Sequence, residues 1–196
     1  TSAVFGMANT VLDILKRETP THLSVAFDTS EPTQRHLDYP DYKAQRDAMP
    51  EDIATQLPYI DRLLDAFNIH VIRRPGYEAD DVIGTLSVQA AAQQREVVIS
   101  TSDKDMAQLV NDHVTLINTM NDTTMDYGGV VEKFGVPPNL IIDLLALMGD
   151  KVDNIPGVAG VGEKTATALL QNLGGIDAIF TQLEAVPNLP IRGAKS

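Results

Sequence analysis

Three carboxylates lie within four residues, at Glu78, Asp80 and Asp81, between an apolar segment and a stretch of helical periodicity. The preceding run, residues 69–72, predicts a buried strand that the Pro75-Gly76 pair ends. The acids therefore occupy the first turn of a helix that follows a strand, on the side away from its apolar stripe. Acids in the first turn of a helix are common because they interact favourably with the helix dipole, but three together exceed what the dipole requires. By itself the cluster leaves a solvated helix start and a metal site both open.

Size and composition favour one globular core with a small appendage. The chain has 196 residues, of which 43% are hydrophobic, and it contains no Cys. No apolar run approaches the ~20 residues of a membrane helix, and the N-terminus has no signal-peptide pattern. We therefore expect a cytoplasmic protein without a membrane partner. Without thiolates, a metal site has to use oxygen or His ligands, and the four His are scattered, so oxygen ligands and Mg²⁺, Mn²⁺ or Ca²⁺ are favoured.

Apolar segments with strand character alternate with helical ones along the chain. Strands are predicted at residues 23–27, 69–72, 97–99 and 114–117. This alternation predicts an α/β fold with a mostly parallel central sheet flanked by helices. An α/β core unit is expected over residues 1–135 and a smaller helical lobe over 136–196, within one compact domain.

Acidic residues follow three of these strands. Asp28 ends the first, Glu78, Asp80 and Asp81 follow the second, and Asp103 and Asp105 follow the third. The carboxyl ends of parallel strands meet at one edge of a sheet, where ligands bind. Two charges ~4 Å apart repel by about 4 kcal/mol at an effective dielectric of ~20, so such acids either spread into solvent or hold cations. Recurrence after successive strands favours two or more metal ions, and a pair of ions ~3.5–4 Å apart can clamp a phosphodiester.

Two further segments bear on function. Residues 29–50 lack periodicity and carry basic side chains, which is typical of a functional loop or arch. A glycine-rich turn at residues 156–162 precedes a helix that starts at Glu163. Glycines let a phosphate approach the backbone, and the N–H groups of a helix start bind it, although a plain tight turn is equally compatible. The net charge of −12 argues against nucleic acid unless many acids belong to one metal site.

The motifs together resemble those of the flap endonuclease family, specifically the 5′ nuclease domains of bacterial DNA polymerase I. They occur in order as Phe27-Asp28-Thr29, Tyr42-Lys43-Ala44-Gln45-Arg46, Gly76-Tyr77-Glu78-Ala79-Asp80-Asp81, Ser102-Asp103-Lys104-Asp105, Met148-Gly149-Asp150, Asp153-Asn154-Ile155-Pro156-Gly157 and Gly160-Val161-Gly162-Glu163-Lys164-Thr165. The resemblance spans essentially the whole chain.

The resemblance implies a divalent-metal nuclease that cuts 5′ flaps and 5′ ends of duplex DNA in primer removal and repair. It implies a helical arch over residues 29–50 and a helix–three-turn–helix clamp in the lobe. The metal-binding acids are expected to be Asp28, Glu78, Asp80, Asp81, Asp103, Asp105, Asp150 and Asp153. Catalytic cations are expected at Arg35, Lys43 and Arg46. DNA contacts are expected from Tyr42, Lys43, Arg46, Lys104, Gly157, Gly160, Gly162, Lys164 and Thr165, with K⁺ at the glycine turn.

The family pattern also sets expectations for the ends of the chain. Family members begin with a strand that ends in a metal-binding acid, and they continue past residue 196 with further helices. We therefore expect a monomeric, nucleoid-associated fragment that is truncated at both ends, continuous with a polymerase domain and poorly active alone. Two alternatives stay open: a non-catalytic module that binds metal and DNA, and a related metal-dependent ribonuclease.

Overall fold

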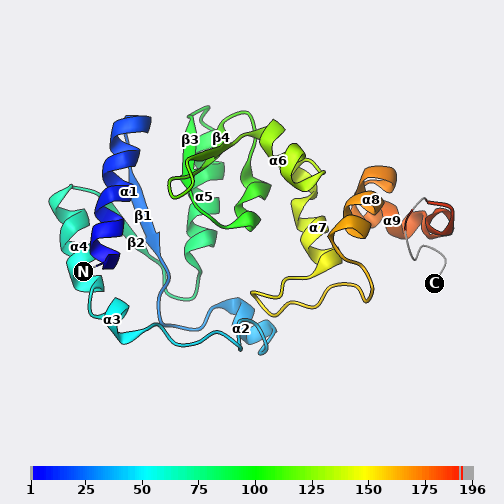
Figure 1. Ribbon diagram of the computed structural model, residues 1–196, viewed down its shortest axis with the longest axis horizontal. Helices are drawn as coiled ribbons and strands as arrows, with labels where there is room; N and C mark the ends of the chain where they lie inside the picture. Colours follow the sequence, from blue (N-terminus) through cyan, green and yellow to red (C-terminus); the bar gives the residue numbers. More distant parts are fainter. Residues whose placement is uncertain (1, 190, 192–196) are drawn as a thin grey trace.

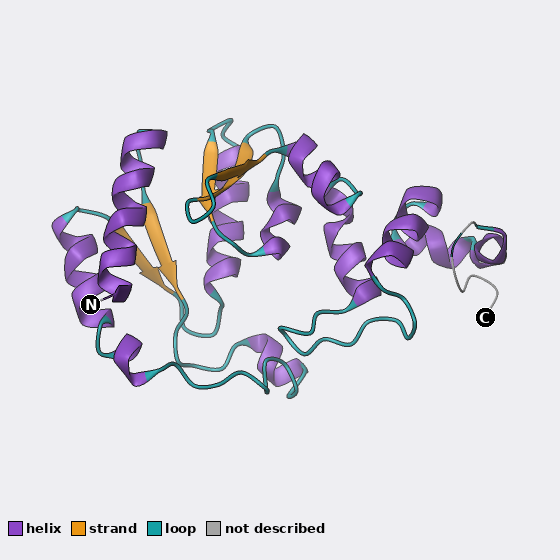
Figure 2. Cartoon of the chain, viewed as in Figure 1, coloured by secondary structure: helices purple, strands orange, loops and turns teal. Residues whose placement is uncertain are grey.

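The computed structural model describes residues 2–189 and 191 (Figure 1). Short strands are embedded among more extensive helices (Figure 2). Within the described residues, none of the helices combines the length and apolar character that a bilayer span requires. The elements follow in the order α1 (Ser2–Glu18), β1 (Ser24–Phe27), α2 (Gln34–Asp38), α3 (Glu51–Ala54), α4 (Leu57–Ala66), β2 (His70–Arg73), α5 (Ala79–Ala91), β3 (Val97–Ser100), η1 (Lys104–Leu109), β4 (Val114–Asn118), β5 (Thr123–Met125), α6 (Tyr127–Phe134), η2 (Pro138–Leu140), α7 (Ile141–Met148), α8 (Glu163–Leu173), α9 (Ile176–Thr181) and η3 (Leu183–Asn188).

Strands β1 and β2 form a parallel pair that α1 and α4 cover. The apolar side chains of Val11, Ile60, Leu64 and Ile69 are buried together beneath these helices. Ile60 and Leu64 are four residues apart, so they lie on the same face of α4.

One predicted helix is divided in two. The helical spacing of the apolar residues Ile53, Leu57, Ile60, Leu63, Leu64 and Phe67 predicts a single helix that opens at Pro50, whereas the structure ends α3 at Ala54 and begins α4 at Leu57. Pro58 explains the break, because its nitrogen carries no hydrogen to donate to the carbonyl of Ala54. The Gln56 side chain at the break accepts a hydrogen bond from the backbone N–H of Ala3, 3.0 Å away, and so caps α1.

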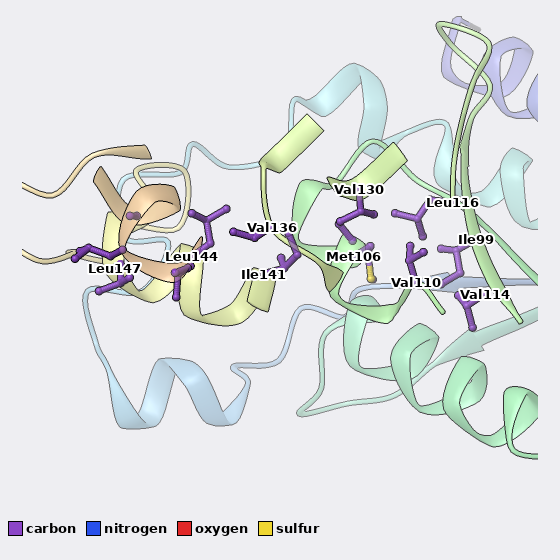
Figure 3. Close-up of a cluster of buried hydrophobic side chains, with 14 of the residues drawn as sticks. Ile99, Met106, Val110, Val114, Leu116, Val130, Val136, Ile141, Leu144 and Leu147 are labelled. Carbon is purple, nitrogen blue, oxygen red and sulfur yellow. The ribbon is translucent and has the colours of Figure 1, made fainter. Parts of the chain in front are cut away.

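Strands β3, β4 and β5 form a second sheet, in which β3 and β4 are parallel and β5 is antiparallel to β4. Strand β5 was not predicted, because residues 118–129 are polar and rich in turn residues. The main hydrophobic core starts on β3 and β4 and continues through α6 and α7 to α8 (Figure 3). The helical lobe after residue 136 therefore shares this core with the second sheet.

The α/β class is confirmed, but the strands form two small sheets instead of one continuous central sheet. Among the described residues, strand pairing joins β1 only to β2, and β3 only to β4. Helix α5 packs against both β1 and β3 and so links the two sheets (Figure 1). Hydrophobic patterning identifies strands but not which strand lies beside which, so the division was not predictable from it.

Candidate metal and nucleic-acid site

The acids that follow β1 and β2 are joined directly. Asp28 lies just past β1, and its Oδ1 accepts a hydrogen bond from the backbone N–H of Ala79, 2.7 Å away, at the start of α5. Glu78 is the N-cap of α5, and Asp81 reaches back to the Glu78 backbone N–H at 3.1 Å. The helix start therefore fixes these acids through its own exposed N–H groups.

Basic side chains of the 29–50 segment pair with these acids. Arg35 donates two hydrogen bonds of 2.7 Å to the carboxylate of Asp81. The Lys43 Nζ lies 2.9 Å from each carboxylate oxygen of Glu78. Two of the three arch residues predicted to be catalytic thus reach the acids that follow β2 in the folded protein.

The loop between α7 and α8 supplies two more acids. Asp150 is 8% exposed, and its Oδ1 accepts hydrogen bonds from the backbone N–H groups of Val152 (2.6 Å) and Asp153 (3.2 Å). The other oxygen of Asp150 lies 2.6 Å from the Lys104 Nζ, and Asp153 lies 2.6 Å from Arg46. Lys104, predicted to touch DNA, here links the end of β3 to this loop.

Mutual repulsion is visible in the remaining acids. Lost hydration and the charges of Asp103, Asp28 and Glu78 raise the pKa of Asp80 to about 6. Burial and the charge of Asp103 likewise raise the pKa of Asp105 to about 6. These side chains lie close enough to oppose each other's ionisation, as expected for acids gathered on one edge.

The paired acids show the opposite effect. The hydrogen bonds from Arg35 hold the pKa of Asp81 below its usual range. Burial opposes ionisation of Asp150, but Lys104 and two backbone N–H donors outweigh it and lower its pKa. We call the acids that follow β1, β2 and β3, together with Asp150 and Asp153 of the α7–α8 loop, the rim. The rim therefore contains acids with counter-charges and acids without them.

The donor set suits a hard divalent cation. Carboxylate oxygens are the ligands that Mg²⁺ and Mn²⁺ prefer, and the buried Oδ1 atom of Asp105 has no hydrogen-bond partner within the part of the chain that the structure describes. As the described side chains stand, no three acidic or His residues converge closely enough to hold an ion. The chemistry of the residues fits a metal, and ligation requires the carboxylates to move closer together.

The glycine-rich turn has two structurally different parts. A side chain at Gly157 would meet the backbone of Met148 and Gly149, with the Leu147 carbonyl oxygen 2.6 Å away. Gly160 and Gly162 face open space, since nothing lies within 4 Å of a Cβ atom built on either. Gly157 is thus required for chain packing, whereas the two later glycines leave the start of α8 accessible.

Sequence reasoning missed the contacts that hold the arch to the α7–α8 loop. The Asn154 side chain donates to the Asp41 carbonyl at 2.7 Å, and the Gln45 side chain donates to the carbonyls of Lys151 (3.0 Å) and Val152 (2.9 Å). These residues are 106 to 113 positions apart, so no local pattern predicts their pairing. The short polar runs around them were the only signal available.

The raised pKa of Asp105 predicts a pH-dependent stability. The pKa of this Asp is about 6 in the folded state and about 4 in the unfolded state. Between about pH 4 and 6 the folded state therefore binds the proton more strongly than the unfolded state does. Its contribution to stability is therefore lost as the pH rises from about 4 through 6. The melting temperature of Asp105→Asn relative to the parent should rise over this range and level off above it, measured with a chelator present. A difference that stays constant with pH would contradict the assignment.

The sequence matches two family models. Residues 1–135 match the 5′-3′ exonuclease, N-terminal resolvase-like domain, and residues 136–194 match the 5′-3′ exonuclease, C-terminal SAM fold. The two matched ranges together cover nearly the whole chain.

Individual proteins agree with the family models. DNA polymerase I of Pseudomonas aeruginosa is 52% identical over 196 residues, which are 100% of this chain and 22% of that protein. The 5′-3′ exonuclease of Aquifex aeolicus is 42% identical over 184 residues, which are 94% of this chain and 64% of that protein. A flap endonuclease of bacteriophage T5, in a pseudo-enzyme-product complex with DNA and metal ions, shares the fold with a TM-score of 0.75 at 24% identity, over 92% of this chain and 70% of the phage chain. The chain thus spans less than two thirds of the length of the Pseudomonas and Aquifex proteins.

Proposed function

Because the chain belongs to the 5′-3′ exonuclease family, we propose that it is a structure-specific nuclease domain that hydrolyses phosphodiester bonds at 5′ flaps and 5′ ends of duplex DNA. The family predicted from the motifs is confirmed by these matches. The observation that carries the proposal is the pairing of the arch cations Arg35, Lys43 and Arg46 with acids that follow β2 and with Asp153 of the α7–α8 loop. The work of the protein would be primer removal and repair at the nucleoid, as a monomer continuous with a polymerase.

Divalent cations would be held by carboxylates from both halves of the chain. The proposed ligands are Asp28, Glu78, Asp80, Asp81, Asp103, Asp105, Asp150 and Asp153. We propose Mg²⁺ or Mn²⁺, in two or more positions, as the ions. When bound, the metal supplies charge stabilisation for the phosphodiester and a more acidic water. The buried, unpartnered oxygen of Asp105 supports this assignment.

The arch cations have two sets of partners under this proposal. Arg35, Lys43 and Arg46 neutralise rim carboxylates in the structure. The same groups can hydrogen-bond the oxygens of a scissile phosphate, because guanidinium and ammonium groups bind phosphate as readily as carboxylate. They would thus orient the strand to be cut and shield its charge from the acids.

The duplex would be held by the turn before α8. Gly160 and Gly162 are open, and Lys164 and Thr165 lie in the first turn of α8, whose N–H groups suit phosphate. A K⁺ ion at this turn is part of the proposal, because a monovalent cation can join backbone carbonyls to phosphate oxygens. These contacts carry no base information, which suits recognition of DNA shape.

Cleavage of a labelled 5′-flap duplex tests the proposed function. The protein made at its natural length should release the flap with Mg²⁺ and not with a chelator. Asp112→Asn, which removes an exposed charge at the start of β4 and away from the rim, is the matched control for rim substitutions. Tight metal and duplex binding with no cleavage would favour a non-catalytic module instead. Preferential cutting of RNA would favour the ribonuclease alternative.

Gly162→Val tests the clamp separately from the chemistry. Gly162 has a φ of −102° and a ψ of −178°, which any residue adopts, and its side is open, so the variant should fold normally. The isopropyl group would block the approach of a phosphate, and we expect duplex affinity to fall about 10-fold, or about 1.4 kcal/mol. Fluorescence anisotropy with a labelled duplex measures this, and calorimetry should show unchanged Mg²⁺ affinity. Lost metal affinity with intact duplex binding would mean that the clamp lies elsewhere.

A further inference from the structure

Tyr42 lies inside the protein, between acids that come from distant parts of the chain. The residue is 6% exposed, and its ring packs edge-on against His36 with the ring centres 5.2 Å apart. Its hydroxyl lies 2.9 Å from Glu78 Oε2 and 3.1 Å from Asp153 Oδ2. The family resemblance implies a DNA contact for Tyr42, which stays a prediction, and in this structure the ring is buried. The hydroxyl faces two of the proposed metal ligands.

A single hydroxyl hydrogen cannot satisfy both carboxylates at once. Glu78 and Asp153 nevertheless approach the same oxygen atom of Tyr42, which brings their negative charges together. A positive group is present to permit this. The Lys43 Nζ lies 2.9 Å from both oxygens of Glu78, 3.9 Å from Asp153 Oδ2 and 4.7 Å from the centre of the Tyr42 ring.

The backbone holds this arrangement in place. The N–H of Lys43 donates to the Asp153 carbonyl at 3.0 Å, so the arch and the α7–α8 loop are joined at the position of the ion pair. Lys43 has a φ of +54°, in the left-handed region that a residue with a side chain rarely adopts. Such a conformation persists only where surrounding contacts hold it, which indicates that the ammonium is directed at the acids by the fold.

We infer that the Tyr42 hydroxyl is a positioning group that holds Glu78 and Asp153 together for metal binding, an inference that rests on the proposed function. The Lys43 ammonium, in turn, occupies the oxygen atoms of Glu78 that a divalent cation would use. The two neighbouring side chains therefore act on metal affinity in opposite directions. Tyr42 is neutral and can keep its hydrogen bond while a metal is bound. Lys43 carries a charge that has to leave Glu78 first.

This division links metal binding to the arch. A cation that binds Glu78 releases the Lys43 side chain, which lies on the segment predicted to meet the scissile phosphate. The released ammonium is then available to the DNA strand, so metal and substrate favour each other by exchange of one positive group. A lysine that only bound phosphate would have no effect on metal affinity in the absence of DNA.

Calorimetric titration of the protein with Mg²⁺, and with Mn²⁺ as a second ion, tests the inference without DNA and without cleavage. At pH 8, Tyr42→Phe should lower the affinity about 5-fold, since it removes the hydroxyl and keeps the ring. Lys43→Met should raise the affinity about 5-fold or more, because it removes the competing charge and keeps the chain length. Lys43→Arg, which keeps the charge, should leave the affinity near that of the parent.

Tyr77→Phe is the matched control, because Tyr77 precedes Glu78 and is 54% exposed, with no side-chain hydrogen bond among the described residues. It should bind metal as the parent does. Thermal unfolding with a chelator checks that each variant is folded, and the Lys43→Met and Lys43→Arg pair decides the question if Tyr42→Phe does not fold. Equal affinities in the parent, Tyr42→Phe and Lys43→Met would overturn the inference and leave the proposed nuclease intact. If the parent protein binds neither Mg²⁺ nor Mn²⁺, the proposed function itself is contradicted.

Discussion

Asp80→Asn is expected to slow flap cleavage about 1,000-fold while raising the melting temperature measured without divalent cations. Burial, and after it the charges of Asp103, Asp28 and Glu78, raise the pKa of Asp80 to about 6, so the side chain is ionised at neutral pH against the repulsion of these neighbours. An amide removes that repulsion, so the folded state gains stability. It also removes a metal ligand, so stability and activity change in opposite directions, as is common at active sites.

Single-turnover cleavage and thermal unfolding with a chelator measure the two effects. Asp112→Asn also removes one negative charge, but from the start of β4, and should change neither quantity appreciably. The addition of Mg²⁺ should raise the melting temperature of the parent and of Asp112→Asn more than that of Asp80→Asn. A melting temperature that falls in Asp80→Asn would show that the carboxylate is part of a structural contact instead of a repulsive cluster.

Gly157→Val is expected to reduce the free energy of unfolding by about 3 kcal/mol. A side chain at this position would collide with the backbone at Met148 and Gly149, and backbone atoms cannot move aside as a flexible side chain can. The backbone hydrogen bond from Val158 N–H to the Leu147 carbonyl, 2.8 Å long, would have to be given up or stretched. The same shift would displace the loop that carries Asp150 and Asp153, so metal affinity should also fall.

Urea unfolding followed by circular dichroism measures this loss, with Gly162→Val as the control. Both variants replace glycine by valine in the same turn, but only Gly157 is enclosed by backbone. The midpoint for Gly162→Val should stay within about 0.5 kcal/mol of the parent when converted to free energy. Equal losses in the two variants would mean that the turn is sensitive throughout and that the contact at Gly157 is not special.

Local features of the fold were predictable from the sequence, and so was the family. The run at residues 69–72 and the acids after it gave strand β2 and the start of α5, because strand and helix periodicities differ clearly there. The break before Leu57 was missed although Pro58 was visible, since proline is also tolerated in the first turn of a helix. Strand β5 was missed because it is three residues long and polar.

The site itself was predictable as a set of residue types but not as a set of contacts. The acids after successive strands can be read from the sequence, because the carboxyl ends of parallel strands meet. The placement of the Tyr42 ring cannot, because it depends on a hydrogen bond to Asp153, 111 positions away. The ion pair between Lys104 and Asp150 is of the same kind. Such contacts follow from the packing of whole helices, strands and loops, and no periodic pattern in the sequence marks them.

The central claim is that carboxylates from the strand ends and from the α7–α8 loop together hold divalent cations. Crystals of the protein soaked in Mn²⁺ test it most directly, because anomalous scattering at the manganese edge locates the ion without reference to activity. We expect anomalous peaks about 2.2 Å from oxygens of Asp80, Asp103 or Asp105, with Lys43 moved away from Glu78. Full Mn²⁺ occupancy elsewhere on the surface, with these carboxylates unmoved and still bound to arch cations, would contradict it.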